Sequence, residues 1–159
     1  MVKSTNMSVL AVALVAATMT AVSPSQTAFA QTSPADEVVG LWEADNGSLK
    51  LDIFDAGGTY SARMLYGVRV MEPDGKTFRL DTKNPDPNLR SRSLERAVIL
   101  KNLKWNAGER RWEGGSLYDG SSGRSVSARA TLNKEKMELR AYVGTPMMGR
   151  TVVLHRVKS

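Results

Sequence analysis

Apolar side chains recur at every second position through most of this chain, which is the spacing that buries one face of a β-strand. Helical periodicity is nearly absent. The alternation is clearest at Val126, Ala128, Ala130 and Leu132, and again at Met137, Leu139, Ala141 and Val143. The pattern predicts eight strands, near residues 38–44, 48–54, 59–68, 97–105, 110–118, 124–132, 136–143 and 149–157.

The segments between most of these strands are short and rich in residues that favour hairpin turns. They include Asn46-Gly47, Ala56-Gly57-Gly58, Asn106-Ala107-Gly108, residues 119–123 and Asn133-Lys134. Consecutive strands should therefore be neighbours, and closing the sheet on itself removes both of its edges. We predict an all-β fold, a single eight-stranded antiparallel up-and-down barrel. A two-sheet sandwich is the alternative, because periodicity does not distinguish closure from stacking.

The first thirty residues have the pattern of a secretory signal peptide. Lys3 precedes a mostly apolar stretch over residues 9–22, and Ala28-Phe29-Ala30 matches a small-x-small cleavage site. The apolar stretch is shorter than the roughly 20 residues that span a bilayer. We expect residues 1–30 to be removed near Ala30 and residues 31–159 to form one domain of a periplasmic or secreted protein.

Composition narrows the remaining possibilities. The chain has no cysteine, which excludes disulfides and cysteine lipidation. An outer-membrane barrel is disfavoured because aromatic residues show no girdle spacing, and Arg129, Glu138 and Arg140 would face lipid. Removal of Lys3 lowers the formal net charge from +6 to +5. Behind a signal peptide this charge favours lipid head groups, acidic glycans or small carboxylates over nucleic acid, or else serves solubility alone.

Residues 81–94 form the one long connection that interrupts the strands. Two prolines and two spaced arginines, Arg90 and Arg92, make it stiff and cationic beyond what a turn requires. These arginines could bind a carboxylate or phosphate near one end of the barrel. Alternatively they could fix the connection by pairing with one of the acidic residues Asp81, Asp86 and Glu95.

Few residues of the chain are suited to catalysis or metal binding. The single histidine, His155, has the place of an ordinary strand residue, and Gly120-Ser121-Ser122-Gly123 is a turn rather than a nucleophile elbow. Aspartates occupy turns that favour them anyway. Asp81, Asp86 and Asn84 do not follow calcium-loop spacing. We expect no catalytic residue, no cofactor and no metal.

Several stretches together resemble the bacterial family called domain of unknown function 2147. They are Gly40-Leu41-Trp42, Asn84-Pro85-Asp86-Pro87, Leu89-Arg90-Ser91-Arg92, Trp112-Glu113-Gly114-Gly115, Tyr118-Asp119, residues 139–144 and Gly149-Arg150-Thr151. The chain departs from the family pattern at Ala141, where glycine is usual, and at Ser93, where proline is common. The resemblance implies a lipocalin-like eight-stranded barrel in exported proteins, with no established biochemical activity.

Gly40, Trp42 and Arg156 are also similar to the signature of the wider lipocalin and fatty-acid-binding superfamily. There a tryptophan of the first strand packs under a basic residue of the last. A guanidinium on an indole face contributes about 0.5 to 2 kcal/mol. This resemblance implies a structural role at the closed end of the barrel.

An eight-stranded barrel encloses only side chains or one small ligand. The inward-facing set is predicted to be Ala62, Met64, Tyr66, Ala128, Met137, Leu139 and Ala141. Small and flexible residues either leave a cavity, with Tyr66, Tyr118 or Tyr142 as a polar anchor, or simply fill the core. We expect a non-enzymatic binding protein for a small apolar or amphipathic ligand, with or without an anionic group, whose contacts include Arg90, Arg92, Met64, Tyr66 and Tyr142. The alternative is a solid barrel that recognises an envelope protein or a glycan or other polymer through its loops.

Overall fold

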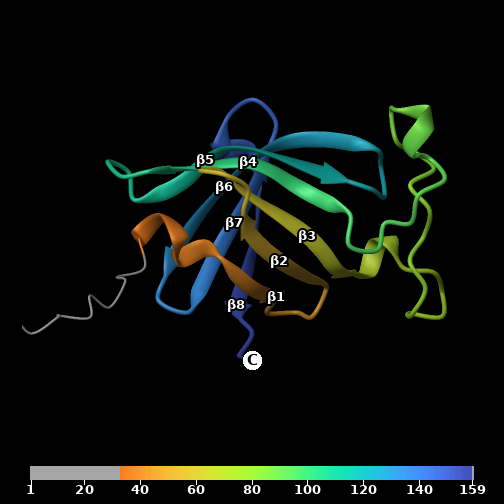
Figure 1. The fold of residues 1–159 in the computed structure, drawn as a ribbon, viewed down its shortest axis with the longest axis horizontal. Helices are drawn as coiled ribbons and strands as arrows, with labels where there is room; N and C mark the ends of the chain where they lie inside the picture. Colours follow the sequence, from red (N-terminus) through yellow and green to blue (C-terminus); the bar gives the residue numbers. More distant parts are fainter. Residues whose placement is uncertain (1–32, 159) are drawn as a thin grey trace, which may run out of the picture. The chain divides into compact units, whose positions relative to one another are not determined.

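The computed structural model describes residues 33–158, which form a closed antiparallel barrel of eight strands. Each strand pairs with its neighbours in sequence, and the last pairs with the first (Figure 1). The strands are β1 (Gly40–Ala44), β2 (Leu49–Asp55), β3 (Tyr60–Gly67), β4 (Val98–Asn106), β5 (Arg111–Asp119), β6 (Arg124–Asn133), β7 (Lys136–Tyr142) and β8 (Arg150–Arg156). The predicted all-β barrel is confirmed, and the sandwich alternative is wrong. The predicted signal peptide lies outside the described residues.

The strand boundaries differ from the predicted ones by two residues at most. The largest difference is at the start of β1, where residues 38 and 39 precede the strand. A short 3-10 helix, η1 (Pro34–Val38), occupies this position. Ser33 accepts a hydrogen bond from the backbone N–H of Ala35, and Pro34 lies in the first turn, where its missing N–H is tolerated.

η1 closes one end of the barrel. Val38 is fully buried, and its carbonyl accepts a hydrogen bond of 2.8 Å from the indole N–H of Trp42. The indole of Trp112 donates to the carbonyl of Ala35 at 2.9 Å. Both tryptophans thereby bury their rings without leaving the ring N–H unsatisfied.

Arg156 completes the closed end. Its guanidinium carbon lies 4.4 Å from the centre of the Trp42 ring, and Trp42 and Arg156 are paired residues of β1 and β8. The same guanidinium donates to the carbonyls of Glu37 and Val39. Gly40, at φ 135°, has no side chain, and a Cβ there would lie 2.6 Å from an Arg156 nitrogen. The residues of the predicted signature therefore lie together.

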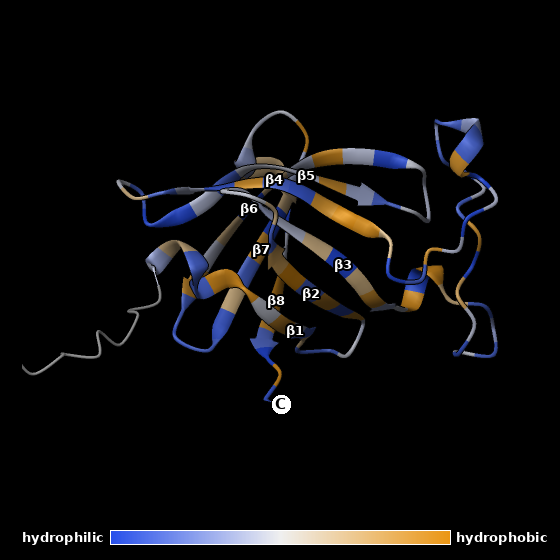
Figure 2. Ribbon diagram, in the orientation of Figure 1, coloured by the Kyte–Doolittle hydropathy of each residue, from blue (hydrophilic) through white to orange (hydrophobic). Residues whose placement is uncertain are grey.

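The half of the interior next to η1 is filled with large side chains. Alternate positions of the strands point inward, which gives the banded hydropathy of Figure 2. Fully buried members are Trp42, Leu51, Ile53, Leu100, Leu103, Trp112, Met137, Leu139 and Leu154. Gly115 lies against this layer, because a Cβ there would lie 2.9 Å from the Leu103 side chain. This half of the barrel is a packed core.

A β-bulge changes the inward set at the end of β3. Leu51 pairs with Met64 but Lys50 pairs with Tyr66, so Leu65 is the extra residue. Beyond the bulge the alternation is reversed, and Tyr66 shares the outer face with Lys50. The prediction that Tyr66 points into the barrel is therefore wrong. Met64 does point inward and is buried.

The connection from β3 to β4 is longer than the predicted loop and spans residues 68–97. It contains η2 (Val68–Val70), η3 (Pro87–Leu89) and isolated bridges between Met71 and Phe78 and between Leu80 and Ser93. It leaves the barrel at the end opposite η1 (Figure 1). We call this segment the long connection.

Within residues 33–158, no helix has the length and apolar character that crossing a membrane requires.

Candidate functional site

A cavity of about 410 Å³ occupies the barrel at the end opposite η1. We call this end the mouth. Its volume is within the range of about 300 to 1,000 Å³ that is usual for small-molecule sites. The apolar part of its lining is Leu49, Met64, Val68, Val70, Ile99, Leu117, Val126, Ala141 and Val152. The two predicted alternatives, an open interior and a filled one, thus each describe one half of the barrel.

The strand register explains why this lining is apolar. Leu117 pairs with Val126, and the inward-facing positions of β6 continue through Ala128. On the neighbouring pair, Ala141 is opposite Arg150, and Val152 follows two residues later on the same face. Ala141 and Val126 are small or short side chains where the deeper layer has Met137 and Leu139, so the space remains unfilled.

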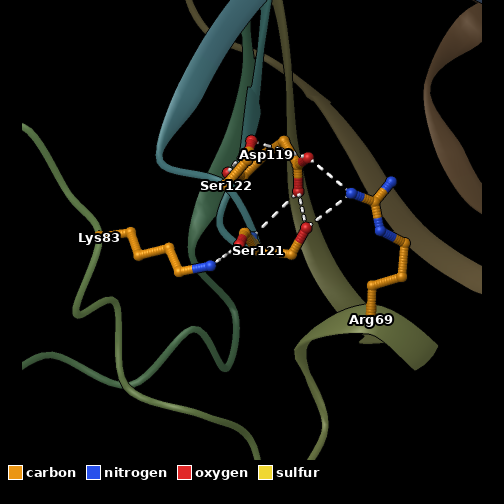
Figure 3. A network of polar contacts seen from close by, with 5 residues as sticks. All are labelled: Arg69, Lys83, Asp119, Ser121 and Ser122. Carbon is orange, nitrogen blue, oxygen red and sulfur yellow. Dashed lines mark hydrogen bonds and ion pairs between the residues drawn. The ribbon is translucent and has the colours of Figure 1, made fainter.

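Asp119, at the end of β5, carries the carboxylate of the mouth, and a network of polar contacts holds it (Figure 3). Arg69 of η2 donates to this carboxylate at 2.8 Å and to the hydroxyl of Ser121 at 2.7 Å. The hydroxyls of Ser121 and Ser122 donate to the same carboxylate at 2.7 and 2.9 Å. Burial raises the pKa of Asp119, but these hydrogen bonds and the charge of Arg69 outweigh it and lower the pKa. Asp119 is therefore ionised and neutralised at neutral pH.

The turn between β5 and β6 also packs against the long connection. The ammonium of Lys83 donates to the carbonyl of Ser121 at 2.7 Å (Figure 3). A Cβ on Gly123 would lie 2.0 Å from the carbonyl oxygen of Lys83, and one on Gly120 would lie 2.7 Å from the Leu94 side chain. Only glycine permits the turn and the connection to approach this closely.

Asp81, the first residue of the predicted loop, is fully buried beside the mouth. Its carboxylate accepts hydrogen bonds from Tyr118, from Asn84 at 2.7 Å and from Arg92 at 2.8 and 3.0 Å. Burial raises the pKa of Asp81, yet these three donors and the charge of Arg92 lower it below the ordinary value of 3.8. Burial and the Asp81 carboxylate raise the pKa of Tyr118 to about 12. The cluster is thus an ionised carboxylate held by a neutral phenol and a cation.

The two arginines predicted from the loop lie in this cluster and do not line the cavity. Arg92 pairs with Asp81, and Arg90 donates to the carbonyl of Asn84 at 2.8 Å. The sequence left two roles open for these arginines, binding an anion or fixing the connection. Their contacts are those of residues that fix the connection.

Of the other predicted ligand contacts, one lines the cavity and two do not. Met64 lines the cavity, whereas Tyr66 and Tyr142 do not. Tyr142 pairs with Ser127, on the outer face of the barrel, because Ala141 beside it points inward. The tyrosine that reaches the cavity is Tyr118. His155 lies at the surface, 3.0 Å from Asp45, as expected of an ordinary strand residue.

Arg124 and Arg150 are cavity-lining residues that the sequence reasoning missed. Each is the first residue of its strand, and each has the inward-facing parity, two positions before Val126 and Val152 respectively. Both are exposed to solvent. Among residues 33–158 neither side chain makes an ion pair or a hydrogen bond. Extending the period-two pattern outward by one step in each strand would have found them.

A metal centre is not formed by the described part of the chain, where no three His, Cys, Asp or Glu side chains gather as ligands.

Comparison with known proteins agrees with this geometry. The model of the family of uncharacterized proteins conserved in bacteria, DUF2147, matches residues 40–156. Among solved structures, the chain is similar to protein HP1028 from the human pathogen Helicobacter pylori, which is described as belonging to the lipocalin family. The two share 26% sequence identity with a TM-score of 0.66, over 77% of this chain and 84% of that one. No curated protein gave a significant match.

Proposed function

The chain belongs to the DUF2147 family, and on its lipocalin-like barrel we propose that it is a non-enzymatic binding protein for one small apolar or amphipathic molecule. The observation that carries this proposal is the cavity of about 410 Å³ at the mouth, lined mainly by aliphatic side chains. An apolar cavity lowers the free energy of unfolding unless the structure collapses into it or a ligand fills it. That this cavity stays open next to a packed core supports a ligand-binding role.

The polar groups at the mouth support binding over catalysis. Asp119 has a lowered pKa and is engaged by Arg69 and two serine hydroxyls, so it is a weak base. The hydroxyl of Tyr118 is occupied by Asp81, and its pKa of about 12 keeps it protonated at neutral pH. Both groups are suited to holding structure at the rim rather than to moving protons.

We place this activity in the periplasm or outside the cell, after cleavage near Ala30. The support is the signal-peptide pattern of residues 1–30 together with the absence of cysteine throughout the sequence. The test is the intact mass of protein recovered from the cell envelope fraction. A mature chain that begins at Gln31 supports the location, and an uncleaved chain in the cytoplasm contradicts it.

The binding proposal is tested with an uncharged, environment-sensitive naphthylamine dye. We expect its fluorescence to rise on binding and Ala141→Phe to abolish the rise, because the ring occupies the cavity next to Val152. Ser127→Phe adds the same ring at an exposed position of β6, opposite Tyr142 on the outer face, and should leave dye binding intact. Equal dye binding by the wild type and Ala141→Phe would contradict a site in the cavity.

A second candidate function is recognition of an envelope protein or polymer. It is favoured by the exposed apolar side chains of Val143, Met147 and Met148 in the connection between β7 and β8, which are 75%, 90% and 84% exposed. Native mass spectrometry of protein purified from its own envelope separates the two. A retained small-molecule adduct supports the carrier function, and a co-purifying macromolecule with an empty barrel supports the second.

A further inference from the structure

The mouth of the cavity carries an excess of positive charge on its inward-facing positions. Arg124 and Arg150 begin β6 and β8, on either side of β7 in the sheet. Arg150 is opposite Ala141, which lines the cavity, and Arg124 lies two residues before Val126, which also lines it. Both guanidinium groups therefore belong to the same face as the apolar lining, one step nearer the solvent.

No acidic group of the lining is available to pair with these arginines. Asp119 is opposite Arg124 in the register of β5 and β6, but its carboxylate is engaged by Arg69 at 2.8 Å and by two serine hydroxyls. Arg69 and Asp119 cancel each other. Two uncompensated positive charges remain at the rim, and among the described residues neither Arg124 nor Arg150 has a polar partner.

Two other arginines, Arg156 and Arg92, differ from this pair because polar partners hold them. Arg156 is engaged by backbone carbonyls at the closed end, and Arg92 by Asp81 beside the mouth. Those side chains have a structural explanation. Arg124 and Arg150 have no such explanation. Valine at both positions would continue the pattern of Val126 and Val152 and pack the rim equally well, so packing does not account for the two arginines.

We infer that Arg124 and Arg150 form an anionic head-group subsite, so that the ligand is a single-chain amphiphile with a carboxylate or phosphate at one end. This inference rests on the proposed function. The alkyl chain lies against Leu117, Val126 and Val152, and the head group accepts charge-assisted hydrogen bonds from the two guanidinium groups at the rim. The cavity volume, in the lower half of the usual range, suits a short or medium chain.

The test is calorimetric titration of the mature protein with decanoate, decyl phosphate and decanol, each below its solubility or micelle limit. The three probes share a chain length and differ in head group. We expect the wild type to bind at least one of the two anions more tightly than decanol, by about tenfold, which corresponds to 1.4 kcal/mol. The double variant Arg124→Gln, Arg150→Gln should lose this preference and retain the affinity for decanol.

Arg129→Gln is the matched control, because Arg129 belongs to β6 but pairs with Arg140 on the outer face, and its loss lowers net charge without touching the rim. It should retain the preference for the anion. The double variant should keep the thermal midpoint of the wild type, because both rim arginines are exposed and make no ion pair or hydrogen bond with any of residues 33–158. The anion preference should also weaken as salt increases.

The outcomes separate the two proposals. If the wild type binds decanol and the dye but prefers neither anion, or if the double variant keeps the preference, the head-group subsite is wrong and the binding function stands. If the wild type binds neither the dye nor any of the three probes, the binding function fails and the subsite fails with it.

Discussion

The hydroxyl of Tyr118, a residue that lines the cavity, donates a hydrogen bond to the fully buried carboxylate of Asp81 in the long connection. This contact joins a wall of the cavity to the segment that passes beside its mouth. Arg92 and Asn84 donate to the other oxygen of the same carboxylate. One buried negative charge and the three donors around it therefore help to hold the long connection against the barrel, together with the contacts of the β5–β6 turn.

Tyr118→Phe removes one of these donors and leaves the shape of the side chain nearly unchanged. We expect the free energy of unfolding to fall by about 1 to 3 kcal/mol, the usual cost of leaving a buried acceptor short of a partner. Urea unfolding measures it. Tyr142→Phe is the control, because Tyr142 lies on the outer face and its hydroxyl makes no hydrogen bond among residues 33–158. Equal stability of the two variants would show that the contact with Asp81 contributes nothing.

Arg92→Gln and Arg90→Gln should differ in stability and agree in ligand binding. Arg92 pairs with the buried Asp81, whereas Arg90 donates only to a backbone carbonyl. We expect the first variant to lose about 1 to 3 kcal/mol and the second to lose less. Neither residue lines the cavity, so dye affinity should match the wild type in both. A loss of dye binding without a loss of stability would restore these arginines as ligand contacts.

Stability should fall in acid partly through Asp81. Its pKa in the folded protein lies below the ordinary value of 3.8, so the unfolded chain takes up a proton first as the pH falls. The contribution of Asp81 is therefore complete above the unfolded pKa, and is lost as the pH falls through the unfolded and then the folded pKa. Unfolding free energies measured in urea between neutral pH and pH of about 3 should fall less steeply for Asp81→Asn than for the wild type. Parallel curves would contradict this.

The alternation of side chains and the short turns are local properties of the sequence, and they predict eight strands paired in chain order. Closure into a barrel rests on the further argument that it removes both sheet edges, because periodicity does not distinguish closure from stacking. Tyr66 was placed on the wrong face because one bulged residue, Leu65, reverses the parity, and nothing in that stretch marks a bulge. The roles of Arg90 and Arg92 depend on where Asp81 and Asn84 lie in three dimensions, which spacing does not give. Arg124 was different, because its parity could be read directly from Val126 and Ala128.

Arg156→Ala should lower the thermal midpoint by about 4 °C or more. The change removes the stacking on Trp42, worth about 0.5 to 2 kcal/mol, and leaves the carbonyls of Glu37 and Val39 without their donor. Arg156→Lys should recover only part of the loss, because an ammonium cannot stack and donate to both carbonyls with the same geometry. Trp42→Ala should be more damaging still, since it also opens a cavity in the packed core. An unchanged thermal midpoint in Arg156→Ala would contradict the proposal that Arg156 stabilises the closed end.

Gly123→Ala tests whether the close approach of the β5–β6 turn to the long connection matters for stability. Gly123 and Gly144 have almost the same φ, 74° and 73°. A Cβ on Gly123 would lie 2.0 Å from the carbonyl oxygen of Lys83, whereas one on Gly144 would meet nothing within 4 Å. Gly144→Ala should therefore cost only the strain of a left-handed alanine, about 1 to 2 kcal/mol.

Gly123→Ala carries the same strain and must in addition displace the backbone at Lys83. We expect a larger loss of unfolding free energy than in Gly144→Ala, together with faster hydrogen exchange in residues 81–94, because the hydrogen bond from Lys83 to Ser121 and the packing of Leu94 on the turn both depend on that contact. Hydrogen exchange in β6 and β7 should change little. If the two alanine variants prove equally stable and protect residues 81–94 equally, the turn does not hold the long connection in place.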